Sequence, residues 1–156
     1  MSADLHARLK AAWWATRDQP DGAPTLSALV ERLFSDHVLE LERTKNDGAP
    51  FPIAPRTAQG ASREGGPDYR YVAYYLPADL HARLKSAWWA LRDAPSLSAV
   101  VEQLLAGEAR RLELAHNAGE RFAPAPDSAR GVNTAAARRQ GEWMRREWES
   151  RRRAAE

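Results

Sequence analysis

The first predicted helical segment of this chain occurs twice in the sequence. Residues 3–18 read ADLHARLKAAWWATRD and residues 78–93 read ADLHARLKSAWWALRD, so fourteen of sixteen positions are identical. The match resumes with PTLSALVERL at 24–33 against PSLSAVVEQL at 95–104. An internal repeat indicates two copies of one supersecondary unit. Each copy is only about 55 residues long, a size at which a lone core is marginal and pairing is the usual remedy.

Each copy is predicted to contain two helices. The first carries apolar side chains at helical spacing: Leu5, Leu9, Ala12 and Trp13, and in copy 2 Leu80, Leu84, Ala87, Trp88 and Leu91. The second begins at Thr25 or Ser96, each a good N-cap directly after a Pro. Its apolar face comprises Leu29, Val30, Leu33, Phe34 and Leu41, and in copy 2 Val100, Val101, Leu104, Leu105 and Leu112. Asn-x-Gly at 46–48 and at 117–119 closes these helices, and the Pro-, Gly-, Ser- and Ala-rich residues 49–69 indicate a linker.

Residues 70–77 read RYVAYYLP, a run of aromatic and aliphatic side chains that ends at the Pro before copy 2. This pattern predicts a short strand. A single strand leaves its backbone groups unpaired, so we expect it to pair with the same strand of a second chain. The predicted fold class is therefore mainly α, with one strand and two helices in copy 2 and two helices in copy 1.

Side chains alternate along a strand, which assigns the two faces of residues 70–77. Leu76 adjoins the helix start and must pack inward, so Val72 and Tyr74 should do the same. The side chains expected to point outward are those of Tyr71, Ala73 and Tyr75. Copy 1 lacks a counterpart, because Met1 aligns with Leu76. We expect the upstream reading frame to encode the missing strand, which would allow pairing within one chain as a pseudo-dimer.

Composition argues against an enzyme. The chain has no Cys, so it has neither a disulfide framework nor a thiolate site. His6 and His81 have no further ligand at metal-binding spacing, and no nucleophile–base–acid set is present. No metal or cofactor is expected. No apolar run approaches the length of a membrane span, which predicts a cytoplasmic protein that does not enter membranes.

Formal charge is distributed unevenly along the chain. The formal net charge is −1 in repeat 1 (residues 1–58), −1 in the linker (59–69), zero in repeat 2 (70–129) and +4 in the tail (130–156). A broad electrostatic grip on nucleic acid is therefore absent from the repeats. The tail is helical or disordered in our prediction, and it is either a basic arm on phosphates, a segment that folds onto a partner, or a solubilising extension. Its basic clusters are Arg138, Arg139, Arg145, Arg146, Arg151, Arg152 and Arg153.

A strand, Leu-Pro, an amphipathic helix, a short turn and a Ser-capped second helix together resemble the ribbon-helix-helix DNA-binding family. The likeness rests on RYVAYYLPADLHARLK at 70–85 and SLSAVVEQLL at 96–105. It covers residues 70–115 fully, and in residues 3–43 only the two helices. Within that family the chain is most similar to actinobacterial-type plasmid partition proteins that bind centromere repeats. The resemblance implies two intertwined units whose strands form an antiparallel ribbon in the major groove.

The outward side chains of the predicted strand are the candidate base contacts. Tyr hydroxyls can bond base edges, and the Ala73 methyl can touch thymine methyl groups. The family usually presents polar or charged groups here, so Tyr71 and Tyr75 are a departure from its pattern. The start of each second helix offers free N–H groups to a phosphate. The candidate phosphate contacts are Ser96, Leu97 and Ser98 in copy 2, Thr25, Leu26 and Ser27 in copy 1, and Arg70.

The sequence therefore predicts a non-enzymatic, site-specific double-stranded DNA-binding protein, associated with a plasmid or the nucleoid. Its expected role is plasmid partition with autorepression, as a dimer or intrachain pseudo-dimer, with a partition ATPase as a candidate partner of the tail. An antitoxin-type repressor whose tail binds a toxin is an alternative. A helical interaction adaptor without DNA binding is another alternative, which the neutral repeats and the missing strand of copy 1 favour.

Overall fold

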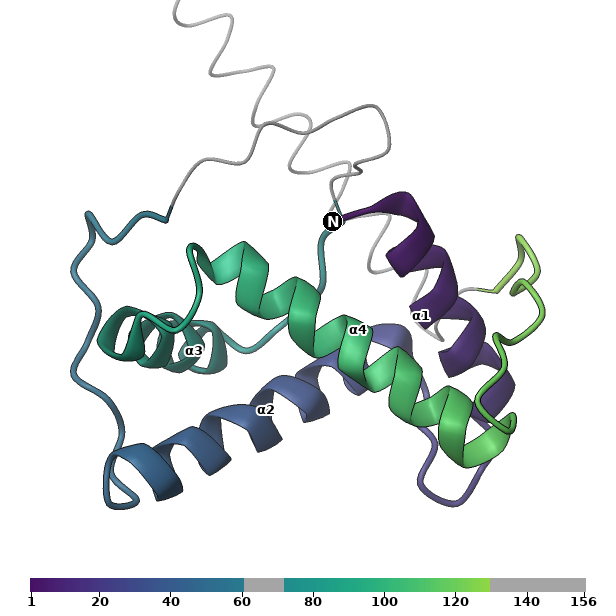
Figure 1. Ribbon diagram of the computed structural model, residues 1–156, viewed down its shortest axis with the longest axis horizontal. Helices are drawn as coiled ribbons and strands as arrows, with labels where there is room; N and C mark the ends of the chain where they lie inside the picture. The colour runs from purple at the N-terminus through teal and green to yellow at the C-terminus, as the bar shows by residue number, and fades with distance from the viewer. Residues whose placement is uncertain (61–71, 130–156) are drawn as a thin grey trace, which may run out of the picture.

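The computed structural model describes residues 1–60 and 72–129, and in these residues the fold consists of four helices (Figure 1). Helix α1 spans Ala3–Thr16 and α2 spans Leu26–Lys45. Helix α3 spans Ala78–Leu91 and α4 spans Leu97–His116. Each repeat therefore contributes a short first helix and a longer second helix, as the apolar spacing predicts.

The predicted strand at 70–77 is wrong for the residues that can be compared. Residues 72–77 run into α3 without strand structure, and no strand is present elsewhere in 1–60 or 72–129. A strand needs a paired neighbour for its backbone groups. Within residues 1–60 and 72–129 only Ser2 has β-bridge geometry, and an isolated bridge is not a strand. The fold class is accordingly helical, not a strand followed by two helices. Arg70 and Tyr71 lie outside the described residues.

The second helices begin and end as their local sequences dictate. The Thr25 hydroxyl accepts from the Ala28 N–H at 3.0 Å, and the Ser96 hydroxyl accepts from the Ala99 N–H at 3.1 Å. At the other end, Gly48 and Gly119 have φ values of +81° and +84°. Their N–H groups donate to the carbonyls six residues earlier in α2 and α4, both at 2.9 Å. This left-handed closure suits glycine, which has no Cβ to clash.

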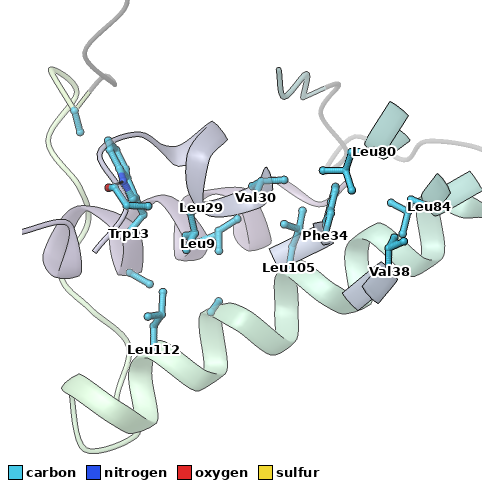
Figure 2. Packing of buried hydrophobic residues seen from close by; sticks show 14 residues of the cluster. Leu9, Trp13, Leu29, Val30, Phe34, Val38, Leu80, Leu84, Leu105 and Leu112 are labelled. Atoms are coloured by element: carbon cyan, nitrogen blue, oxygen red, sulfur yellow. Dashed lines mark hydrogen bonds between the residues drawn. The ribbon is translucent and has the colours of Figure 1, made fainter. Parts of the chain in front are cut away.

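The two repeats are intertwined. Helix α1 packs chiefly against α4, and α3 packs chiefly against α2, whereas the two helices of one repeat touch each other less (Figure 1). Each first helix therefore lies on the second helix of the other repeat, which gives the chain an approximate internal two-fold symmetry. A smaller cluster of Trp88, Ala94 and Val100 lies within repeat 2, whereas the main hydrophobic core is shared by both repeats (Figure 2). Its larger members are Leu9, Trp13, Leu29, Val30, Phe34, Val38, Leu80, Leu84, Leu105 and Leu112.

Two equivalent ion pairs cross between the repeats. Arg8 on α1 binds Glu113 on α4 in a bidentate manner, with N···O distances of 2.6 and 2.5 Å. Arg83 on α3 binds Glu42 on α2 in the same way, at 3.1 and 2.5 Å. Glu42 and Glu113 are only 4% and 1% exposed. The hydrogen bonds from Arg8 hold the pKa of the Glu113 carboxyl below its usual value, so it stays ionised in the core.

The segments after α2 and α4 return across the other repeat. We call residues 46–60 strap 1 and residues 117–129 strap 2. Strap 1 lies on α3, where the Ala54 N–H donates to the Ser86 hydroxyl at 3.1 Å. Strap 2 returns to α1, where Arg121 pairs with Asp4 at 3.0 Å. Composition marks residues 49–69 as a linker, yet the part in strap 1 includes buried Phe51 and Ala58.

Replacing Arg83 with alanine should lower the free energy of unfolding by about 3 kcal/mol. This is the lower end of the range for breaking a buried pair, because the guanidinium is partly exposed while Glu42 would remain as a buried bare charge. The matched control is Arg43→Ala, which removes an exposed pair with Glu40 on α2. Urea unfolding followed by circular dichroism measures both. Equal midpoints for the two variants would show that the crossed pair does not anchor the fold.

Candidate nucleic-acid interface

The segment 72–77 keeps the alternation predicted for it, although it forms no strand. Val72, Tyr74 and Leu76 are half-buried, whereas Ala73 and Tyr75 are exposed, Tyr75 to 51%. Tyr74 and Leu76 pack against the shared core. The exposed pair therefore points away from the body, on a segment that runs beside the chain's first residues (Figure 1).

Tyr74 links this segment to the other repeat. Its hydroxyl lies 3.5 Å from Nδ1 of His6 on α1. Burial raises the pKa of Tyr74 to about 12, so the phenol is neutral near pH 7. The neighbouring start of the chain is held as well, since the amino group of Met1 pairs with Glu102 of α4 at 3.3 Å. The segment thus rests on both repeats.

The starts of α2 and α4 are the second element of the candidate interface. The first residues of the two helices, Leu26 and Leu97, pack against the same core as Tyr74. The first N–H groups of each helix have no intrahelical acceptor, and the N-cap hydroxyl bonds to only one of them. Such groups, at the positive end of a helix dipole, suit an anion. Ser98 is exposed, while Thr25, Ser27 and Ser96 are half-buried.

A buried Trp in each repeat fixes where the second helix begins. The indole N–H of Trp13 donates to the carbonyl of Ala23 at 2.9 Å, and that of Trp88 donates to Ala94 at 2.9 Å. Each carbonyl belongs to the residue two positions before an N-cap. The loop between α1 and α2 is longer than the loop between α3 and α4, yet both loops end on the equivalent hydrogen bond from a Trp indole to a carbonyl. A tight fold at Gly22, where a Cβ would lie 2.3 Å from the Arg17 carbonyl oxygen, helps to absorb the extra residues.

The second Trp of each pair stacks with an arginine at the end of the first helix. The Arg17 guanidinium carbon lies 3.4 Å from the centroid of the Trp14 ring, and that of Arg92 lies 3.3 Å from the centroid of Trp89. These cation–π contacts are partly exposed, a setting in which each stabilises by about 0.5–1 kcal/mol. Stacking engages the face of each guanidinium and leaves its in-plane N–H groups to hydrogen bonding, as in the bond from Arg17 to the Trp14 carbonyl.

The end of strap 1 covers part of the start of α4. A Cβ placed on Gly60 would fall 2.5 Å from the Cα of Ser96 and 2.9 Å from the carbonyl oxygen of Pro95. The chain approaches the helix start this closely because glycine has no side chain. Sequence reasoning missed this contact, since Gly60 reads as one of several linker glycines. Of the candidate phosphate contacts at this start, Ser98 is therefore the open position and Ser96 the covered one.

Several candidate residues lie outside the described part of the chain. These are Arg70, Tyr71 and all of the tail arginines: Arg138, Arg139, Arg145, Arg146, Arg151, Arg152 and Arg153. Residues 1–60 and 72–129 together carry 13 Lys and Arg against 15 Asp and Glu, a formal net charge of −2. Within them, no three metal-binding side chains come together. No helix in these ranges combines the length and the apolar character needed to cross a membrane.

Comparisons with protein-family models, with curated proteins and with solved structures found no match to this chain. Its function is therefore inferred from its own residues and their geometry.

Gly60→Ala should destabilise the protein by about 1–3 kcal/mol, because the added methyl overlaps the backbone of Ser96. Gly107→Ala is the matched control, since a Cβ at this helical position meets nothing within 4 Å. That change should instead stabilise α4 by about 0.5–1 kcal/mol. Thermal unfolding of both variants measures whether each substitution lowers or raises the stability of the protein. A neutral or stabilising Gly60→Ala would show that strap 1 is not seated on the start of α4.

Proposed function

We propose that this chain binds double-stranded DNA at a specific sequence, through Ala73, Tyr75 and the starts of α2 and α4. The observation that carries the proposal is the shared placement of these elements. Two capped helix starts, related by the internal symmetry, pack on the same core as the segment that exposes Tyr75. Backbone N–H groups at helix starts commonly contact phosphates and position a protein on a duplex.

The chemistry of each part suits a different feature of DNA. The N–H groups at Leu26, Ser27, Leu97 and Ser98 would hold phosphates and set the orientation of the protein without reading bases. Tyr75 would read base edges through its hydroxyl, and the Ala73 methyl would contact thymine. This assignment does not require a strand, because residues 72–77 already present the two side chains outward.

The biological setting that we propose is plasmid partition with autorepression of the operon. Its support is the resemblance of the second repeat, in its Leu-Pro junction and its Ser-capped second helix, to centromere-binding proteins of the ribbon-helix-helix family. In that setting the tail would contact a partition ATPase. An antitoxin-type repressor is the related alternative, and there the same tail would bind a toxin.

A protein-interaction adaptor is the second candidate function. It is favoured by the formal net charge of −2 on residues 1–60 and 72–129, which opposes approach to a polyanion. Exposed apolar side chains at Leu39, Ile53 and Leu114 would suit such a role. A DNA-binding protein should enrich particular duplexes from a random pool, whereas an adaptor should enrich none.

Tyr75→Ala should relax sequence preference by roughly 1–3 kcal/mol if the side chain makes a good base contact. Full-length protein would first select duplexes from a random pool, and affinities for a selected and a scrambled duplex would then be compared. The control is Ile53→Ala, which removes an even more exposed apolar side chain on strap 1 and should leave the preference unchanged. Failure of the full-length protein to enrich any duplex would reject the proposal and support an adaptor.

Deleting residues 130–156 should weaken binding to selected and scrambled duplexes alike. The deletion removes a charge of +4 and leaves −2, so the body must approach DNA against its own charge. The slope of log affinity against log salt should become shallower by roughly 0.9 for each phosphate that the tail neutralises. A salt titration of both proteins measures this slope. Unchanged affinity and slope would assign the tail to a protein partner.

A further inference from the structure

We infer that the surface joining the two repeats also joins repeats of different chains, so that the protein forms an exchanged dimer with a second copy of itself. In this dimer, repeat 1 of each chain packs on repeat 2 of the other. The partner is identified by the surface itself, because the complementary half is present on every copy of the chain. Self-association of this kind does not depend on DNA binding.

The first support is that the strongest contacts run between repeats, not within them. Helix α1 packs mainly on α4 and α2 mainly on α3, while α1 touches α2 and α3 touches α4 less. Both bidentate ion pairs cross the same boundary. In a lone repeat, Glu42 or Glu113 would lose the arginine that pairs with it, and the helix faces that pack on the other repeat would be exposed. An open repeat would therefore expose a large surface that only another repeat can cover.

The second support is that exchange preserves the contacts between repeats. Strap 1 belongs to repeat 1 and bonds to Ser86 of repeat 2, and strap 2 belongs to repeat 2 and bonds to Asp4 of repeat 1. If repeat 2 comes from another chain, these bonds form in the same way. The Met1–Glu102 and His6–Tyr74 contacts also run between repeats and are equally retained. Within residues 1–60 and 72–129, these contacts between repeats are the same in the closed chain and in the exchanged dimer.

Mass action sets the conditions under which the exchanged dimer forms. A tether between two binding partners gives an effective concentration in the millimolar range for short flexible linkers. The closed single chain should therefore prevail in dilute solution, and exchange should become visible as protein concentration approaches that range. A weakened closed form would lower this threshold, since exchange is a low-cost route to dimers when identical elements are available.

Charge reversal provides a direct test in the full-length protein. In Arg83→Glu, two carboxylates face each other in the closed chain, and in Glu42→Arg two guanidinium groups do. Each variant alone should unfold at lower urea than the wild type. An exchanged dimer contains one chain of each variant. In one of its units the two substituted side chains meet and form a reversed ion pair. In the other unit the unsubstituted Glu42 and Arg83 form the native pair. Unfolding and refolding the mixture should therefore give a stable heterodimer, identified by native mass spectrometry through its mixed mass.

The control is the double variant Arg83→Glu/Glu42→Arg in one chain, which restores the pair and should refold as a monomer. If the double variant folds but the mixture gives no heterodimer, the inference is overturned. If the double variant does not fold, Arg8→Glu and Glu113→Arg offer the equivalent test on the other pair. Independently, heavy- and light-isotope wild-type chains refolded together near ~1 mM, the order of the tethered concentration, should give dimers of mixed mass. Their absence would also overturn it.

Discussion

A buried carboxylate that must find a guanidinium on the other repeat is the constraint on which this structure depends. A bare carboxylate in the core costs several kcal/mol, so Glu42 and Glu113 restrict the packings in which both repeats can be buried. Arg83 on α3 and Arg8 on α1 form ion pairs with these carboxylates, and the two pairs determine which helices pack together. Once α1 lies on α4 and α3 on α2, each strap can reach the opposite first helix, and the two helix starts are placed around one core.

The helices could be predicted from the sequence because their determinants are local. Apolar spacing, the caps at Thr25 and Ser96 and the Asn-x-Gly endings need no knowledge of distant residues. The strand at 70–77 was predicted wrongly because a strand depends on a neighbour, and composition cannot supply one. The crossed ion pairs were missed for the same reason. Their signal was available, since Arg and Glu recur at equivalent positions of both repeats, but a repeated charge is first interpreted as a solvated face.

The same contrast between local and distant determinants applies to the candidate interface. Exposure of Ala73 and Tyr75 follows from simple alternation, which extended backbone imposes even without a ladder. The seating of Gly60 on Ser96 was not predictable, because it joins residues that composition assigns to a linker and to a cap. The straps had a faint signal in FPIAPRTAQG at 51–60 against FAPAPDSARG at 122–131. Matching turns, with Ala58 bonded to Pro55 and Ala129 to Pro126, show that the repeat extends this far.

The hydrogen bond from Ala54 to Ser86 has a consequence for how such a protein can evolve. The equivalent of Ser86 in repeat 1 is Ala11, and both positions are buried. In a dimer of identical chains every substitution occurs twice, so a change that helps one half must be tolerated in the other. Here a hydroxyl is present on one side only, where it meets a strap N–H. Fusion of the two units in one polypeptide lets each half acquire its own contacts, and the symmetry can be lost one residue at a time.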